Sequence, residues 1–333
     1  CIRDRFMGAS DTINKTGPSV IFAYLIAGMF LFLVMRAMGE MVYLHPTTGS
    51  FAHFASDYIH PVAGYITAWS NIFQWIVVGM SEVIAVGQYM NYCFPELPQW
   101  IPGVIVILLL AAANLVSVKA FGEFEFWFAM IKVVTIILMI IAGLGLIFFG
   151  LGTRHATGLS NLWTHGGFMP HGWVGFFFAL SIVVASYQGV EFTKVMKNGV
   201  PAFAVAAISI GILVGALLNV ILPKLIPGAD NVFVYVYSAS ILPGMIPWFM
   251  ILISHLRFRK LHPDQVEGHP FKMPGGAVGT FITIIFFILV LIGMLFNKEQ
   301  VISLLIGVVF LAFMTAYYFI KGYHKMSEEK QRF

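Results

Sequence analysis

The sequence predicts an all-α integral membrane protein, and three observations support this fold class. Hydrophobic residues make up 59% of the 333 residues, whereas charged residues make up only 10%. The mean hydropathy of +0.88 is far above that of an ordinary soluble domain. Apolar runs of about 20 residues, the length that a helix needs to cross a bilayer, recur from one end of the chain to the other. Because backbone groups find no partners in lipid, each run is expected to form a helix.

Nine apolar runs are candidate membrane spans, and helix-breaking residues separate several of them. The spans cover residues 19–41, 61–92, 101–115, 126–149, 172–191, 202–222, 232–256, 278–296 and 301–320. Gly17 and Pro18 precede the first span, and Pro274 with two glycines precedes the eighth. The second span is too long to cross upright, so a tilted helix is expected. Polar stretches between the spans are short, which predicts a single transmembrane domain over residues 1–333.

Lysine and arginine residues predict the orientation of these spans. If the spans alternate, one side of the membrane receives Arg36, Lys119, Lys194, Lys197, Arg257, Arg259, Lys260, Lys272, Lys321 and Lys325. By the positive-inside rule this side is cytoplasmic, and so is the C-terminus. The net charge of +4 then reflects orientation in a lipid bilayer, and no nucleic-acid partner is expected. Cys1 and Cys93 suggest no disulfide framework, and no metal-ligand spacing is present.

Glu82 and Lys132 are ionisable residues inside predicted spans. An ionised Glu82 would be costly in lipid, so it is either hydrogen-bonded for structural reasons or part of a functional cavity. Lys132 lies near one end of its span. A buried lysine can gain and lose a proton near neutral pH, whereas a lysine near the interface can extend its ammonium group into water. Both interpretations remain open for each residue.

The fifth predicted span ends in the unusual sequence A-S-Y-Q-G-V-E. Small residues beside Ser186, Tyr187, Gln188 and Glu191 suit a broken helix whose free backbone groups line a cavity. The alternative is an ordinary helix end at the interface, anchored by the tyrosine. Arg36 and Glu40 stand four residues apart near another helix end, and this spacing predicts a local ion pair.

Five blocks of sequence carry a resemblance to a known family. They read M-G-A-S-D-T-I-N-K-T-G-P-S-V-I-F-A-Y-L-I-A-G, M-R-A-M-G-E-M, T-G-S-F-A-H-F-A, V-K-A-F-G-E-F-E-F-W-F-A-M-I-K and S-N-L-W-T-H-G-G-F-M-P-H-G-W. Together they resemble a bacterial amino acid permease of the amino acid transporter branch of the amino acid–polyamine–organocation (APC) superfamily. The resemblance covers nearly all of residues 7–325.

This resemblance implies a LeuT-like fold of inverted repeats and proton-coupled uptake of an amino acid by alternating access. In this family the unwound middles of the first and sixth helices hold the substrate, with help from the third and eighth. The matching substrate-binding residues are Ser81 and Glu82 on the third helix, and Ala185, Ser186, Tyr187, Gly189 and Glu191 at the sixth-helix break. Lys132 matches a fifth-helix lysine whose amine replaces a sodium ion, which implies a proton-coupling role. The proton is the coupling ion, and no cofactor and no metal are expected.

The chain departs from the family pattern in two places. C-I-R-D-R-F stands where the family has a motif like C-I-G-T-G-L-F, so most of the first helix is expected to be missing. After Glu191 and Phe192 the sequence continues as T-K-V-M-K-N-G-V-P, which resembles the loop after the eighth helix. The second half of helix six and helices seven and eight are therefore expected to be absent, with a junction near residues 192–194. The expected fold is incomplete, with about nine transmembrane helices.

The sequence thus predicts a permease of the bacterial plasma (inner) membrane and not an enzyme, because no nucleophile–base pair or metal cluster lies within a span. A small neutral amino acid is the expected substrate, since the site offers no dedicated charge beyond Glu82 and Glu191. The pattern specifies neither the amino acid nor an oligomeric state. The alternative hypothesis is a non-transporting remnant that at most associates with an intact permease.

Overall fold

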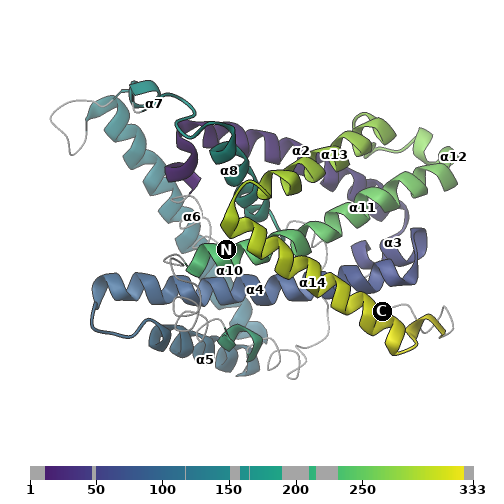
Figure 1. Cartoon of the computed structure of the whole chain (residues 1–333), viewed down its shortest axis with the longest axis horizontal. Helices are drawn as coiled ribbons and strands as arrows, with labels where there is room; N and C mark the ends of the chain where they lie inside the picture. The colour runs from purple at the N-terminus through teal and green to yellow at the C-terminus, as the bar shows by residue number, and fades with distance from the viewer. Residues whose placement is uncertain are drawn as a thin grey trace.

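The computed structural model describes residues 12–46, 50–116, 118–150, 158–164, 166–189, 210–214 and 232–325, and within them it contains helices but no strand (Figure 1). The helices in chain order are η1 (Gly17–Ser19), α2 (Val20–Leu44), α3 (Ser50–Tyr58), α4 (Pro61–Cys93), α5 (Trp100–Val116), α6 (Val118–Phe149), α7 (Asn161–Thr164), α8 (Gly172–Ser186), α10 (Val232–Ala239), α11 (Ile241–Leu261), α12 (Pro263–Glu267), α13 (Gly276–Met294), α14 (Lys298–Ile320) and η2 (Tyr323–Lys325).

Helix α11 forms the centre of the helix assembly. It packs against α2, α3, α4, α8, α13 and α14, which lie around it in Figure 1. Two of its large side chains, Trp248 and Phe258, are almost completely or completely buried. Met38 of α2 and Phe287 of α13 join the same hydrophobic core. The core therefore brings helices from both halves of the chain together.

Helices α5 and α6 lie at the periphery. Helix α6 extends away from the other helices in Figure 1, and its principal neighbour is α5. Most of its apolar side chains from Ile131 onwards are exposed, as expected of a lipid-facing helix. The helix begins at Val118, before the predicted span 126–149, because the preceding residues are too polar for a span but still continue the helix. Its apolar part, Ala129–Phe149, agrees with the predicted span.

The all-α prediction is confirmed, and eight of the nine predicted spans coincide with described helices. Among the described residues, six helices are long and apolar enough to cross a membrane, and Trp100–Ala112 and Gly172–Ser186 are shorter apolar helices. The remaining predicted span, residues 202–222, lies largely outside the described residues. The chain is thus a helical, multi-pass membrane protein.

Two predicted spans are interrupted or shortened in the structure. The predicted span 232–256 consists of α10 and α11, which meet at Ser240. Pro243 causes this break, because it has no N–H group to bond the carbonyl of Ala239 one turn earlier. Helix α8 ends at Ser186, five residues before the predicted end, and the chain continues as a turn to Gly189. Gly189 has a φ of 96°, a conformation that glycine adopts readily.

Helix α3 was not predicted, because it is too short and too polar for a membrane span. It packs on α4 and α11 through Phe51, Phe54 and other buried residues. Arg257 of α11 donates hydrogen bonds to the carbonyl groups of Tyr58 (2.9 Å) and Ile59 (3.2 Å). These bonds satisfy carbonyl groups that are left unpaired at the C-terminal end of α3.

Candidate functional site

The C-terminal end of α8 is half-buried where it meets α2, α4 and the start of α11. Its last turn is closed by hydrogen bonds from the Tyr187 N–H to the Val184 carbonyl (3.2 Å) and from the Gln188 N–H to the Ala185 carbonyl (3.1 Å). A helix that ends inside a membrane protein leaves polar backbone groups where lipid or apolar side chains are normally found. Such an end is a candidate site for a polar ligand.

Gln188 connects this helix end to two other helices. Its side-chain Oε1 accepts a hydrogen bond from Nε2 of Gln74 on α4 (3.0 Å), and its Nε2 donates to the carbonyl of Ile241 on α11 (3.3 Å). Gln74 is 1% exposed. Gly244 of α11 makes room for this arrangement, because a Cβ atom there would overlap the amide group of Gln188. The three helices therefore share a polar centre inside the protein.

The neighbouring residues of the α8 end pack on the other side. The hydroxyl of Tyr187 donates to the carbonyl of Tyr24 on α2 (3.4 Å), and Gly28 one turn later leaves space for it. Gly189 faces the ring of Trp75, to which a Cβ atom would come within 3.2 Å. Ser186 bonds only locally, to the carbonyl of Val183 (2.7 Å), and Ala185 is buried. Of the predicted site residues, those from 185 to 189 are thus brought together.

The other predicted site residues lie elsewhere or outside the described residues. Ser81 is buried on α4 and donates to the carbonyl of Val77 (3.0 Å), and the adjacent Glu82 is half-buried on the same helix. Lys132 is exposed on α6, whose main neighbour is α5. Glu191 lies outside the described residues.

Sequence reasoning did not assign a role to the polar face of α4. Thr67, Ser70, Asn71 and Gln74 are all buried and recur every three or four residues, the spacing that places them on one side of a helix. The regular spacing of these polar residues within an apolar span could have indicated this face from the sequence alone. Gln74 is the member of this face that reaches the end of α8.

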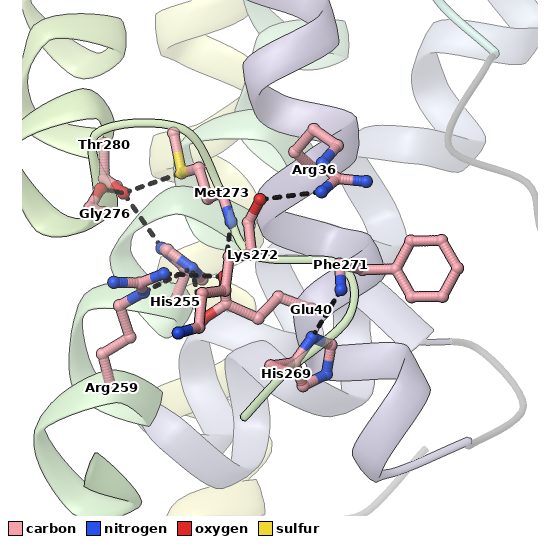
Figure 2. Close-up of polar contacts among 10 residues, drawn as sticks. All are labelled: Arg36, Glu40, His255, Arg259, His269, Phe271, Lys272, Met273, Gly276 and Thr280. Carbon is pink, nitrogen blue, oxygen red and sulfur yellow. Dashed lines mark hydrogen bonds and ion pairs between the residues drawn. The ribbon is translucent and has the colours of Figure 1, made fainter. Parts of the chain in front are cut away.

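A second polar cluster joins one end of α2 to α11 and α13, and Figure 2 shows it. Glu40 of α2 is completely buried; its Oε2 accepts hydrogen bonds from Nη2 of Arg259 (2.8 Å) and from the backbone N–H of Met273 (2.7 Å). Its Oε1 lies 3.4 Å from Nε2 of His255. Nδ1 of His255 lies 2.9 Å from the hydroxyl of Thr280 on α13. We refer to Glu40, His255, Arg259 and Thr280 as the Glu40 cluster.

The predicted local ion pair between Arg36 and Glu40 is wrong. Nη2 of Arg36 donates instead to the carbonyl of Lys272 (2.8 Å), and its guanidinium group lies 5.5 Å from the ring centre of Phe271 (Figure 2). The tertiary structure brings Arg259 and the N–H of Met273 to Glu40, so the buried carboxylate is paired by donors from other segments while Arg36 bonds elsewhere.

Metal binding finds no support in the described part of the chain, where no group of three or more His, Cys, Asp or Glu side chains could hold an ion.

Comparison with known proteins decides the family. The model of a family described as "Amino acid permease" matches residues 5–196 and 191–330, which together cover almost the entire chain. The chain belongs to the amino acid permease family.

Relatives of this permease include curated bacterial transporters. It is 45% identical to the probable threonine/serine transporter YbxG of Bacillus subtilis, over 97% of this chain and 92% of the relative. It is 27% identical to the amino-acid permease AapA of Bacillus subtilis, over 94% and 89% of the two chains. It is 44% identical to the aromatic amino acid transport protein AroP of Escherichia coli, over 56% and 40%. These relatives confirm the resemblance to amino acid permeases and the prediction that the chain is not an enzyme.

The comparisons also describe the middle of this permease. The two segments that match the family model meet at residues 191–196. The alignment with the threonine/serine transporter extends over 429 positions, whereas this chain has 333 residues. At least the difference, 429 minus 333 or 96 positions, therefore has no counterpart in this permease. Its fold is partial relative to these relatives.

Replacing Gly244 with alanine should displace Gln188 from Gln74. The added methyl group would occupy the position of the Gln188 amide, and losing a buried hydrogen bond costs about 1–2 kcal/mol. Gly39→Ala is the matched control, because its Cβ atom would meet nothing within 4 Å and reports the helix propensity of alanine alone. Thermal unfolding in detergent should show Gly244→Ala to be less stable than Gly39→Ala. Equal stability of the two variants would contradict this account of the Gln188 contact.

Proposed function

We propose that this permease carries an amino acid site at the end of α8 and that its substrate is a small neutral amino acid, taken up with protons by alternating access. The observation that carries the proposal is the half-buried end of α8, where Gln188, Gln74 and the carbonyl of Ile241 meet. The C-terminal end of a helix carries partial negative charge, which suits the ammonium group of an amino acid. Side-chain amides can pair with the carboxylate and with a small polar side chain.

The preference for a small neutral substrate follows from the residues at this end. Those described there supply amide, hydroxyl and backbone groups, from Gln74, Gln188, Ser186 and Tyr187. None of these described residues is charged, which favours a substrate side chain without charge, because an unpaired buried charge is costly. The 45% identical relative is named as a threonine/serine transporter, so threonine and serine are the first substrates to test. In the bacterial inner membrane, a cytoplasmic C-terminus agrees with the distribution of basic residues.

Lys132 is the proposed proton-coupling residue. Its side chain is exposed on α6. This chain lacks a segment that its relatives have, and that segment would form further helices. One of these helices would pack against α6 and cover it. We propose that the missing positions correspond to the second half of helix six and to helices seven and eight, because the two matched segments meet at residues 191–196.

Lys132→Met, introduced at the matching position of the full-length relative from Bacillus subtilis, should leave folding intact but remove the pH dependence of uptake. Methionine keeps most of the packing volume of the lysine stem but cannot bind a proton. Measuring uptake at several pH values between about pH 5 and about pH 8, the range around physiological pH, checks this prediction. Replacing the residue that matches the exposed Lys298 with methionine is the control. An unchanged pH profile would contradict the coupling role and would favour the alternative, in which Lys132 only extends its ammonium group into water.

The missing segment favours a second candidate function, that of a non-transporting remnant. Alternating access needs two groups of helices that move relative to each other, and at least 96 positions of the aligned transporter have no counterpart here (429 minus 333). Such a chain would retain the membrane helices and the α8 end without a complete transport path.

Uptake of radiolabelled threonine and serine into proteoliposomes separates these two candidates. With an inward proton gradient, a functional permease accumulates the label, and collapsing the gradient with a protonophore abolishes the accumulation. Proteoliposomes that contain the full-length relative are the positive control, and empty liposomes are the negative one. Retention at the level of empty liposomes would refute transport by this chain and support the remnant.

A further inference from the structure

The Glu40 cluster contains an unusual combination of groups. Glu40 and His255 are 0% exposed, and Arg259 is 20% exposed at its side chain. Three helices and the segment before α13 contribute to it: Glu40 from α2, His255 and Arg259 from α11, the N–H of Met273, and Thr280 from α13 (Figure 2). A buried cluster of titratable groups that the proposed transport path does not use raises the question of what it binds.

The hydrogen-bond pattern assigns His255 as neutral with its proton on Nδ1. Nε of Arg259 donates to Nε2 of His255 (3.2 Å), so Nε2 is an acceptor without a proton. The hydroxyl of Thr280 donates to the carbonyl of Gly276 or to Sδ of Met273, so it accepts the Nδ1 proton of His255. This tautomer is assigned from the partners on both sides of the ring.

The same pattern leaves one oxygen without a proton donor. Oε1 of Glu40 is buried and has no hydrogen-bond partner, although it lies 3.4 Å from Nε2 of His255. A buried acceptor without a donor costs free energy. One additional proton, placed on Nε2 of His255, would supply a donor to this oxygen. It would also remove the acceptor that Arg259 now uses, because a protonated imidazole has no free lone pair.

The other charged groups near the Glu40 cluster do not provide the missing proton donor for Oε1 of Glu40. On α2, Arg36 donates to the carbonyl of Lys272, and it is a permanent cation. In the segment before α13, Lys272 is exposed, and Nδ1 of His269 accepts from the N–H of Phe271 (3.0 Å). On α3, His53 pairs with Asp57 (3.1 Å). Among the groups that the structure places in contact with His255, Glu40 is the carboxylate and Arg259 the cation.

We propose that Glu40 and His255 form a buried proton-binding site whose occupancy decides whether Arg259 is held in the cluster. Without the proton, Arg259 links His255 and Glu40. With the proton, His255 donates to Oε1 of Glu40, and Arg259 faces a second cation at 3.2 Å. Like charges in a buried site repel strongly, and the long arginine side chain can move its head group to water. Proton binding therefore exchanges an arginine link between α11 and α2 for a histidine link.

This inference does not depend on the proposed transport function, because it concerns a different site from Lys132 and needs no substrate. Solid-state NMR of the full 333-residue chain in lipid, with 15N-labelled histidine and arginine, tests it. The difference spectrum between the wild type and His255→Gln identifies His255 among the ten histidines. At about pH 8, above the usual titration range of histidine, its signals should show the Nδ1–H tautomer.

On lowering the pH, His255 should become cationic, and the Nε–H of Arg259 should then exchange with water roughly tenfold faster, as expected for the loss of one hydrogen bond. In His255→Gln this exchange should no longer change as the other histidines titrate. His269→Gln is the matched control, a buried histidine outside the cluster that should leave the wild-type response intact. An Nε2–H tautomer at high pH, or an Arg259 signal that ignores the protonation of His255, would overturn the proposal.

Discussion

Replacing Glu40 with leucine should lower the free energy of unfolding by about 3–5 kcal/mol, because it leaves the partners of a buried carboxylate unpaired. Oε2 of Glu40 accepts from both Arg259 and the N–H of Met273. Leucine has a similar volume but no acceptor. The N–H of Met273 would then remain buried without its acceptor, and Arg259 would lose the carboxylate that holds its guanidinium group in the cluster. The two segments that Glu40 joins, α2 and the residues before α13, would lose this link, whereas the bond from Arg36 to the carbonyl of Lys272 would remain.

Unfolding by denaturant in mixed micelles measures this loss. Glu40→Gln should be milder, with a loss of about 1–3 kcal/mol, because an amide oxygen can still accept from Met273 but carries no charge. Glu96→Leu is the control for removing a carboxylate from an exposed position, and its effect should stay within about 0.5 kcal/mol. A loss below about 1 kcal/mol for Glu40→Leu would show that the pair contributes little net stability, as some buried ion pairs do.

The purified chain should bind amino acids with a dissociation constant weaker than about 100 µM, near 5.5 kcal/mol of binding free energy. A micromolar site has about 8 kcal/mol in total, and each unmet polar group of a bound zwitterion costs about 1–3 kcal/mol. If, as proposed, the missing helices would contact part of the substrate, this chain lacks those contacts. The loss of two or three of them would remove most of the binding free energy. The amides of Gln74 and Gln188 already bond to each other, so a ligand must also break that bond.

Isothermal titration with a panel of amino acids that includes threonine and serine measures this affinity. The full-length 45% identical relative, titrated in the same detergent, shows that the conditions permit binding. Saturable binding by this chain tighter than about 100 µM, the limit set by the affinity arithmetic above, would show that the α8 end alone supplies enough contacts.

The sequence predicted the position of the break at the end of α8 but not the contacts that residues make there. The small and polar residues 185–189 indicated a broken helix, and the helix does end at Ser186. The partner of Gln188 could not be predicted, because Gln74 is 114 residues away and any polar residue on a neighbouring helix could have served. Gly244 shows the same limit: a glycine near Pro243 reads as a helix breaker, and its role as space for Gln188 exists only in the packed structure.

The amino acid sequence by itself determined which segments enter the membrane, because the transfer of an apolar helix into lipid depends on that segment alone. It also determined the family, through blocks of residues that need no tertiary information. Only the tertiary structure decided the partners of the polar groups. Arg36 is the nearest cation to Glu40 along α2, yet packing of α11 on α2 brings Arg259 and His255 to Glu40. The partner of a buried charge is determined by how the helices pack, and this packing depends on all the helices together.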